Sequence, residues 1–160
     1  MKRLLSIGFI GLTLASLSCG QRSGLSESER VAVADSVRQM MDSYVKDVNA
    51  SGLLAEFRYL DNSPAFFWVP PGYSTPISYD SVASFVRAAA PGQRAIDGAW
   101  EQLRIEPLSR DHAVYTGILR QSMTDTAGSN TRYRVIETGV VIRRPEGWKL
   151  LGGQTALLAE

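Results

Sequence analysis

The sequence predicts a single α+β domain, with helices in its first half and an antiparallel sheet in its second half. Apolar residues between 33 and 48 recur at the spacing of one helical face, which predicts a long amphipathic helix. After residue 96, long runs rich in β-branched and aromatic residues are separated by short turn sequences, which is typical of strands. Helices followed by hairpin-connected strands indicate an α+β fold, and 160 residues fit one domain.

Three helices are expected before the long strands. Ser26 followed by Glu29 is a capping-box pattern, so the first helix begins there and runs to about Asn49. Its apolar face consists of Val33, Val37, Met40, Met41, Tyr44, Val45 and Val48. A second, shorter helix is expected over 53–59, and a third ends near Ala90, before a Pro-Gly pair.

One short and four long strands account for the remaining apolar runs. Residues 65–69 (Ala-Phe-Phe-Trp-Val) predict a short buried strand that ends at Pro70. The long strands are expected at about 96–108, 112–123, 132–143 and 148–158, joined by turns of hairpin composition. This order predicts an antiparallel meander.

The turn positions also predict which side chains share each face of the sheet. Pairing across the turns places Glu137 opposite Gln154, with Arg120 on the same face. The face toward the helices is expected to hold Leu103, Ile105, Val114, Ile118, Val135, Val141 and Leu150, with Glu137 and Gln154 among them. The other face is expected to hold Trp100, Tyr115, Leu119, Ile136, Val140, Leu151 and Leu157. Because an antiparallel sheet normally exposes one face to water, this second apolar face predicts a homodimer formed through it.

The first eighteen residues have the features of a signal peptide. Lys2 and Arg3 precede an apolar run over 4–15, which is shorter than the roughly 20 residues of a membrane span. The sequence Ser-Leu-Ser-Cys over 16–19 resembles the lipobox of bacterial lipoproteins, although that motif prefers Leu three places before the cysteine. The resemblance implies that Cys19 is lipidated and becomes the first residue of the mature chain.

On this interpretation the chain has a signal peptide over 1–18, a lipidated tether over 19–25 and a folded domain over 26–160. The protein would lie in the bacterial cell envelope, anchored to a membrane by lipid and facing the periplasm or the exterior. Cys19 is the only cysteine, and lipidation would remove an unpaired thiol from an oxidising compartment. The alternative is an ordinary secretory peptide that is cut nearby, with Cys19 incidental.

Charge and composition exclude several kinds of partner. The chain has 17 basic and 16 acidic side chains, and Lys2 and Arg3 leave with the signal peptide, so no basic footprint for nucleic acid is expected. His112 is the only histidine, which gives no set of metal ligands. No Gly-rich phosphate loop or Ser-His-Asp set is present, so no metal and no cofactor is expected.

The last two predicted strands resemble those of a known family. Residues 140–151 read Val-Val-Ile-Arg-Arg-Pro-Glu-Gly-Trp-Lys-Leu-Leu, an apolar strand, a charged turn with Gly-Trp and a Lys-aliphatic restart. This hairpin, with the order of elements over 26–158, resembles the nuclear transport factor 2-like superfamily, especially its SnoaL-like and secreted uncharacterised branches. The resemblance implies a curved sheet wrapped around the long helix as a cone. Its open end would hold a cavity in which members bind small apolar ligands or, in some cases, isomerise, cyclise or dehydrate them.

The chain departs from this family at the end of the same hairpin. Gly152, Gly153 and Gln154 occupy the stretch in which many relatives place histidines that point into the cone. The missing imidazoles count against an acid–base enzyme. Gly139, expected opposite Gly152, would leave side-chain volume empty beside Glu137, which predicts either a pocket or a sharp bend of the sheet.

The candidate site is built around a carboxylate on the helix-facing side of the sheet. A carboxylate among apolar side chains has a raised pKa, so Glu137 is a candidate general base, with Tyr44 donating a hydrogen bond to a developing oxyanion. The alternative is an internal ion pair of Arg120 with Glu137, completed by Gln154, that only satisfies buried polar groups. The ligand-binding candidates are Tyr44, Phe67, Trp68, Arg120, Glu137 and Gln154.

Three functions are compatible with the sequence. The first is a membrane-anchored, non-catalytic domain that binds a small apolar or amphipathic molecule in its cone. The second is an enzyme of the isomerase, cyclase or dehydratase type that uses Glu137. The third is a structural or assembly module of the envelope that docks through its exposed sheet. A titratable carboxyl in the cavity would favour the enzyme, and a collapsed cavity would favour the structural module.

Overall fold

The computed structural model describes residues 24–159, so the predicted signal peptide and Cys19 lie outside the described residues. The elements are α1 (Glu27–Ser51), the 3-10 helix η1 (Leu53–Arg58), β1 (Phe67–Val69), α2 (Tyr79–Ala89), the 3-10 helix η2 (Ala90–Gly92), β2 (Gln93–Pro107), β3 (His112–Asp125), β4 (Asn130–Arg144) and β5 (Gly147–Leu157). Within residues 24–159, none of the helices is long and apolar enough to cross a membrane.

Helix α1 begins and packs as its sequence predicts. The Ser26 hydroxyl accepts a hydrogen bond from the Glu29 amide at 3.3 Å, and the Glu29 carboxylate accepts one from the Ser26 amide at 2.9 Å. This reciprocal pair is a complete capping box. The helix ends at Gly52, whose φ of 80° favours glycine. Its buried residues are Val33, Val37, Met40, Met41, Val45 and Val48, the apolar face expected from the periodicity.

The other two predicted helices differ in type. The segment Leu53–Arg58 is a 3-10 helix, so the described residues contain two α-helices and two short 3-10 helices where three helices are expected. Helix α2 starts after Ser78, whose hydroxyl accepts a hydrogen bond from the Ser81 amide at 3.3 Å. Both α-helices are thus capped by a serine side chain.

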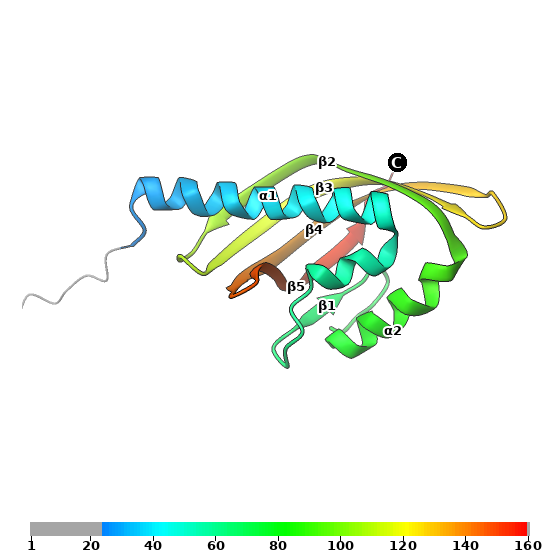
Figure 1. Ribbon diagram of the computed structural model, residues 1–160, viewed down its shortest axis with the longest axis horizontal. Coiled ribbons are helices and arrows are strands. Elements are labelled where there is room, and N and C mark those ends of the chain that lie inside the picture. Colours follow the sequence, from blue (N-terminus) through cyan, green and yellow to red (C-terminus); the bar gives the residue numbers. More distant parts are fainter. Residues whose placement is uncertain (1–23, 160) are drawn as a thin grey trace, which may run out of the picture.

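The sheet has five strands in the order β1-β5-β4-β3-β2. The four long strands form the expected antiparallel meander, and the short β1 adds to its edge in parallel with β5. Figure 1 shows the sheet curving along α1, with α2 near the C-terminal end of that helix. The α+β class and the curved antiparallel sheet are confirmed.

The predicted register is wrong by one residue between β3 and β4. Gly117, and not Ile118, pairs with Glu137, because Met123 pairs with Thr131 and Thr124 with Asn130, so the chain reverses through a shorter loop than expected. The same slip occurs between β2 and β3, where Pro107 pairs with Ala113. A one-residue slip turns every side chain of a strand to the opposite face.

This slip changes which residues point toward the helices. Tyr115 and Leu119, expected on the outer face, are buried inside at 2% and 6% exposure. Trp100 also faces inward, where its ring meets Tyr115 and its indole nitrogen donates to the Met41 carbonyl of α1. Val114 and Ile118, expected inside, alternate with these buried positions and lie on the outer face.

A second departure occurs in β5. Arg143 pairs with Trp148 and Val141 with Leu150, as expected, but a register shift follows and Val140 pairs with Gly152. Gly139 therefore lies opposite Gly153, and the space beside it is filled by the ring of Tyr115. The expected empty volume is not there. A Cβ on Gly139 would lie 2.7 Å from the Gly152 carbonyl oxygen and 2.9 Å from that ring.

Candidate functional site

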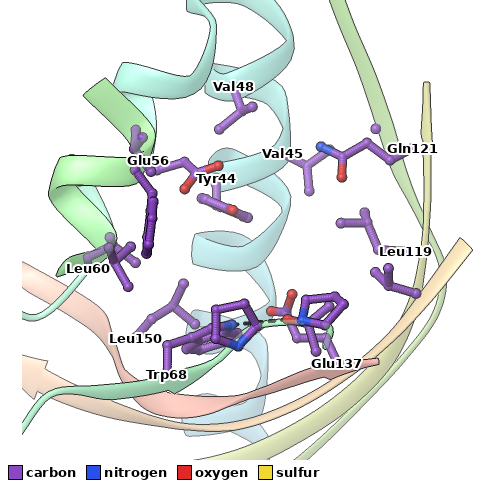
Figure 2. A pocket seen from close by; sticks show the side chains of 18 of the residues that line it. Tyr44, Val45, Val48, Glu56, Leu60, Trp68, Leu119, Gln121, Glu137 and Leu150 are labelled. Atoms are coloured by element: carbon purple, nitrogen blue, oxygen red, sulfur yellow. Dashed lines mark hydrogen bonds between the residues drawn. The ribbon is translucent and has the colours of Figure 1, made fainter. Parts of the chain in front are cut away.

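A cavity of about 470 Å³ lies between the inner face of the sheet, the C-terminal half of α1, η1 and α2. Its walls are largely apolar and include Val45, Val48, Leu60, Leu119, Val135 and Leu150, several of which appear in Figure 2. Helix α2 contributes Val82, Phe85 and Val86. The interior of the cone is therefore open and has not collapsed onto α1.

Glu137 forms the polar end of this cavity. Its side chain projects from β4, is only 7% exposed, and accepts a hydrogen bond from the Tyr115 hydroxyl at 2.6 Å. The Thr155 hydroxyl also interacts with this carboxyl, and it accepts a hydrogen bond from the Trp68 indole nitrogen at 3.0 Å. Burial raises the pKa of Glu137 from 4.5 to about 7, and the bonds from Tyr115 and Thr155 offset part of this effect.

Glu56 is a second carboxyl that lines the same cavity. It comes from η1, and its carboxyl interacts with the side chain of Tyr44 of α1 (Figure 2). Burial, and then the charge of Glu137, raise the pKa of Glu56 to about 7, although the interaction with Tyr44 lowers it in part. Burial in turn raises the pKa of the Tyr44 phenol well above its ordinary value. Two carboxyls that can hold a proton near neutral pH therefore share one space.

Further polar groups line the side of the cavity formed by β3 and β4. The Tyr133 hydroxyl donates a hydrogen bond to Gln121 Oε1 at 2.9 Å, and burial raises the pKa of this tyrosine. Asn49 also lines the cavity, but its amide is used by the backbone of Gly98, with bonds of 2.9 and 2.7 Å. Asn49 therefore holds α1 against β2.

Only part of the predicted site is brought together. Tyr44, Trp68 and Glu137 line the cavity, whereas Phe67, Arg120 and Gln154 do not. Arg120 and Gln154 are the predicted partners of Glu137. The register slips described above move both of them away from it. Arg120 pairs with Arg134 on the neighbouring strand, and its guanidinium contacts Asp97 at 3.3 Å. Gln154 lies opposite Thr138 and is exposed, and Thr155 takes the place beside Glu137.

Phe67 points to the other side of the sheet from Trp68, because successive side chains of a strand alternate. Its ring lies over Gly152, where a Cβ would come within 2.4 Å of the ring. Phe67 therefore packs on the outer face of the sheet and not in the cavity. The expected ion pair of Arg120 with Glu137 is also wrong, because Arg120 contacts Asp97 instead.

Sequence reasoning misses Glu56, Tyr115 and Thr155. The one-residue errors of register account for Tyr115 and Thr155. Glu56 belongs to a segment predicted as helical, and the three-residue spacing from the buried Leu53 is the signal that places both on one face of a 3-10 helix.

The mouth of the cavity is lined by exposed apolar side chains. Tyr73 and Phe85 are 44% and 52% exposed, and their rings meet edge to face with centroids 6.2 Å apart. Leu157 of β5 lines the cavity as well and is also exposed. An apolar molecule entering the cavity would contact these residues first.

The residues that line the cavity include no lysine, arginine or histidine. Among the described residues, no group of three or more histidine, cysteine, aspartate or glutamate side chains could hold a metal ion. The arrangement can accept hydrogen bonds and protons at two carboxyls, donate from tyrosines, and enclose an apolar body.

No protein-family model and no curated protein gives a significant match to the sequence. The structure, in contrast, is similar to many solved structures. A nuclear transport factor 2-like superfamily protein from Salmonella enterica serovar Typhimurium gives a TM-score of 0.69 at 12% identity, over 81% of this chain and 94% of that chain.

Two further structures show the same similarity. The type 3 hexachlorocyclohexane dehydrochlorinase from Novosphingobium barchaimii gives a TM-score of 0.65 at 15% identity, over 84% of this chain and 92% of that chain. An uncharacterized protein with a cystatin-like fold from Caulobacter vibrioides gives a TM-score of 0.61 at 13% identity, over 78% of this chain and 89% of that chain. At these identities the likeness concerns the fold alone. This chain therefore has the nuclear transport factor 2-like fold.

Proposed function

We propose that this domain binds a small, largely apolar molecule inside its cavity. The observation that supports this function is an open cavity of about 470 Å³ with largely apolar walls and a few polar groups, among them Glu137 and Glu56. Small-molecule sites are typically concave, of about 300–1,000 Å³, and lined by apolar side chains with a few convergent polar groups. A purely structural module would have no need to keep this volume open.

The polar end would set the orientation of the ligand. Tyr115, Thr155 and Trp68 form a chain of hydrogen bonds that fixes the Glu137 carboxyl at the cavity wall. A polar group of the ligand would bind there, and its apolar body would contact the walls supplied by α1 and α2. Burial of apolar surface would supply most of the binding free energy, at about 25 cal/mol per Å².

Filling the cavity tests this proposal. Leu119→Trp places a larger side chain inside, and Ile118→Trp is the matched control because the neighbouring residue of β3 points to the outer face. Native mass spectrometry of protein purified without denaturation should detect a retained small molecule in the wild type and in Ile118→Trp, but not in Leu119→Trp. Equal retention in all three would place the ligand elsewhere, and no retained or added apolar molecule in any of them would contradict the proposal.

We also propose that the domain is attached to a membrane of the cell envelope through lipid on Cys19. Support comes from the sequence alone: the positive start, the short apolar run and the Ser-Leu-Ser-Cys stretch. The tether over 19–25 would then link the lipid to the Ser26 cap of α1. The cavity would be held close to the membrane surface.

An enzyme is the second candidate, because burial raises the pKa of both Glu137 and Glu56 to about 7. A general base works best with a pKa near the operating pH. Glu137 would remove a proton from carbon next to a carbonyl and return it elsewhere, with a tyrosine hydroxyl donating to the developing oxyanion. A solved structure with this fold is a dehydrochlorinase, so the fold is compatible with enzymatic chemistry.

A β,γ-unsaturated cyclic ketone in D₂O is a suitable probe for this second candidate. Isomerisation to the conjugated ketone with deuterium uptake should be catalysed by the wild type and abolished in Glu137→Gln. Glu101→Gln is the control, because its carboxylate contacts Arg134 outside the cavity. A rate in Glu137→Gln equal to that of the wild type would exclude Glu137 as the base.

A further inference from the structure

We infer that the ligand of this cavity carries a basic nitrogen on an aromatic or otherwise apolar body. The inference rests on the ligand-binding function proposed above and names its ligand class. It starts from two carboxyl groups, Glu56 and Glu137, that enter one apolar cavity from different elements without a basic side chain among its lining residues (Figure 2).

Several carboxylates elsewhere in the fold, including the buried Asp61, are paired with arginine. Asp61, buried near the start of β1, is bound by Arg144 through two bonds of 2.7 and 2.8 Å. Asp47 of α1 is bound by Arg58 at 2.9 Å. Arginines also contact the carboxylates of Glu29, Asp97, Glu101 and Glu106. In the cavity no such arginine is present, so a positive charge that balances Glu56 and Glu137 would come from the ligand.

The groups that face the two carboxyls are neutral on every side. Tyr44 comes from α1, Tyr115 from β3, Tyr133 from β4 and Thr155 from β5, and each offers a hydroxyl. No lysine, arginine or histidine contributes to the pKa shift of either carboxyl. The charge of Glu137 instead raises the pKa of Glu56. A bound cation would relieve this repulsion and replace lost solvation.

The aromatic lining suits an organic cation better than a bare metal ion. Tyr44, Trp68 and Tyr133 lie around the carboxyls, and Tyr73 with Phe85 lies at the mouth. Aromatic rings attract ammonium groups through their π electrons and also bury apolar surface. Hard metal ions are usually bound by several carboxylates and other oxygen ligands, and within residues 24–159 no three histidine, cysteine, aspartate or glutamate side chains are grouped so that they could hold one.

The inference predicts a specific dependence on pH. An ammonium group binds best when both carboxyls are ionised, so its affinity should rise as the pH increases through about 7. A neutral ligand of the same shape gains nothing from ionised carboxyls, so its affinity should stay level or fall. An anionic ligand should bind most weakly above pH 7.

Three probes with one carbon skeleton separate these cases: 1-naphthylmethylamine, 1-naphthylmethanol and 1-naphthoate. Binding to the full-length protein is measured by calorimetry at pH 5.5 and pH 8. The amine should bind at least about tenfold more tightly than the alcohol at pH 8, and this preference should shrink at pH 5.5. Glu137→Gln and Glu56→Gln should each reduce the preference, whereas Glu101→Gln, the same change outside the cavity, should leave it unchanged.

The outcomes distinguish this inference from the function on which it rests. If the alcohol or the carboxylate binds as tightly as the amine at pH 8, the inference is wrong, although the cavity still binds ligand. If none of the three binds, the ligand-binding function is contradicted as well. The comparison of probes on the wild-type protein needs no variant, so it decides the question even if a glutamine variant fails to fold.

Discussion

Glu137→Gln should remove a pH-dependent cost of folding. Burial raises the pKa of this carboxyl from 4.5 to about 7 in the folded protein. The folded state therefore holds the proton more tightly than the unfolded state, and the associated stability is present at low pH and is lost as the pH rises through 7. Glutamine resembles the protonated carboxyl, because it is neutral and its oxygen can still accept the Tyr115 hydrogen bond.

The size of the effect follows from the pKa shift. One pKa unit corresponds to about 1.4 kcal/mol, so ionising Glu137 should lower the free energy of unfolding of the wild type by about 2–3 kcal/mol between pH 5 and pH 8. The variant should lose less stability than the wild type over this range, because only Glu56 still ionises in the cavity. The pKa of Glu56 stays raised by burial, although removing the charge of Glu137 should lower it in part.

Urea denaturation followed by circular dichroism at pH 5 and pH 8 measures both free energies. Wild type and variant should be similar at pH 5, and Glu137→Gln should be the more stable protein at pH 8. The control Glu101→Gln should follow the wild type at both values. If Glu137→Gln instead lost stability in parallel with the wild type, the carboxyl would be solvated or ion-paired, and the cavity site described above would be wrong.

Four further changes test other parts of the structure. Gly139→Ala should lower the free energy of unfolding by about 1–3 kcal/mol in urea, because its Cβ meets backbone and a buried ring, and an unchanged value would refute this packing. Asp61→Asn should lower the free energy of unfolding by about 2 kcal/mol, because it breaks the pair with Arg144. This pair also lowers the pKa of Asp61, so the stability advantage of the wild type should vanish in acid, and an advantage that persists there would argue against the pair. We propose a homodimer through the outer sheet face, so Val140→Glu should sediment as a monomer, and a monomeric wild type would contradict the dimer. Cys19→Ala should release the protein from membranes, whereas a mature N-terminus at another residue would exclude lipidation there.

The elements can be predicted because their signals are local. The capping box at Ser26 and Glu29 and the apolar spacing along α1 are encoded within a few turns of one helix. The long strands are bounded by turn sequences close to those that the structure shows. The order of helices and strands can therefore be predicted from patterns that extend over only a few neighbouring residues.

The site can be predicted only in part, because it depends on register. The sequence places Glu137 and Val135 on the inner face correctly, since their alternation along β4 is local. It places Tyr115 outside, because a β3–β4 connection one residue shorter than expected, with Met123 paired to Thr131, turns all of β3 over. The irregularity in β5 after Leu150 likewise exchanges Gln154 for Thr155. Bulges depend on packing between strands, which a pattern along one strand does not report.

The protonation of Glu137 can be observed without reference to stability or to a ligand. Carbon-13 NMR of glutamate carboxyl groups, with the Glu137 signal assigned by its absence in Glu137→Gln, follows the ionisation of this one side chain. An apolar cavity without a basic partner predicts a titration midpoint near 7. A midpoint at or below the ordinary value of about 4.3 would mean that Glu137 is solvated or paired with a cation, and the proposed site would be contradicted.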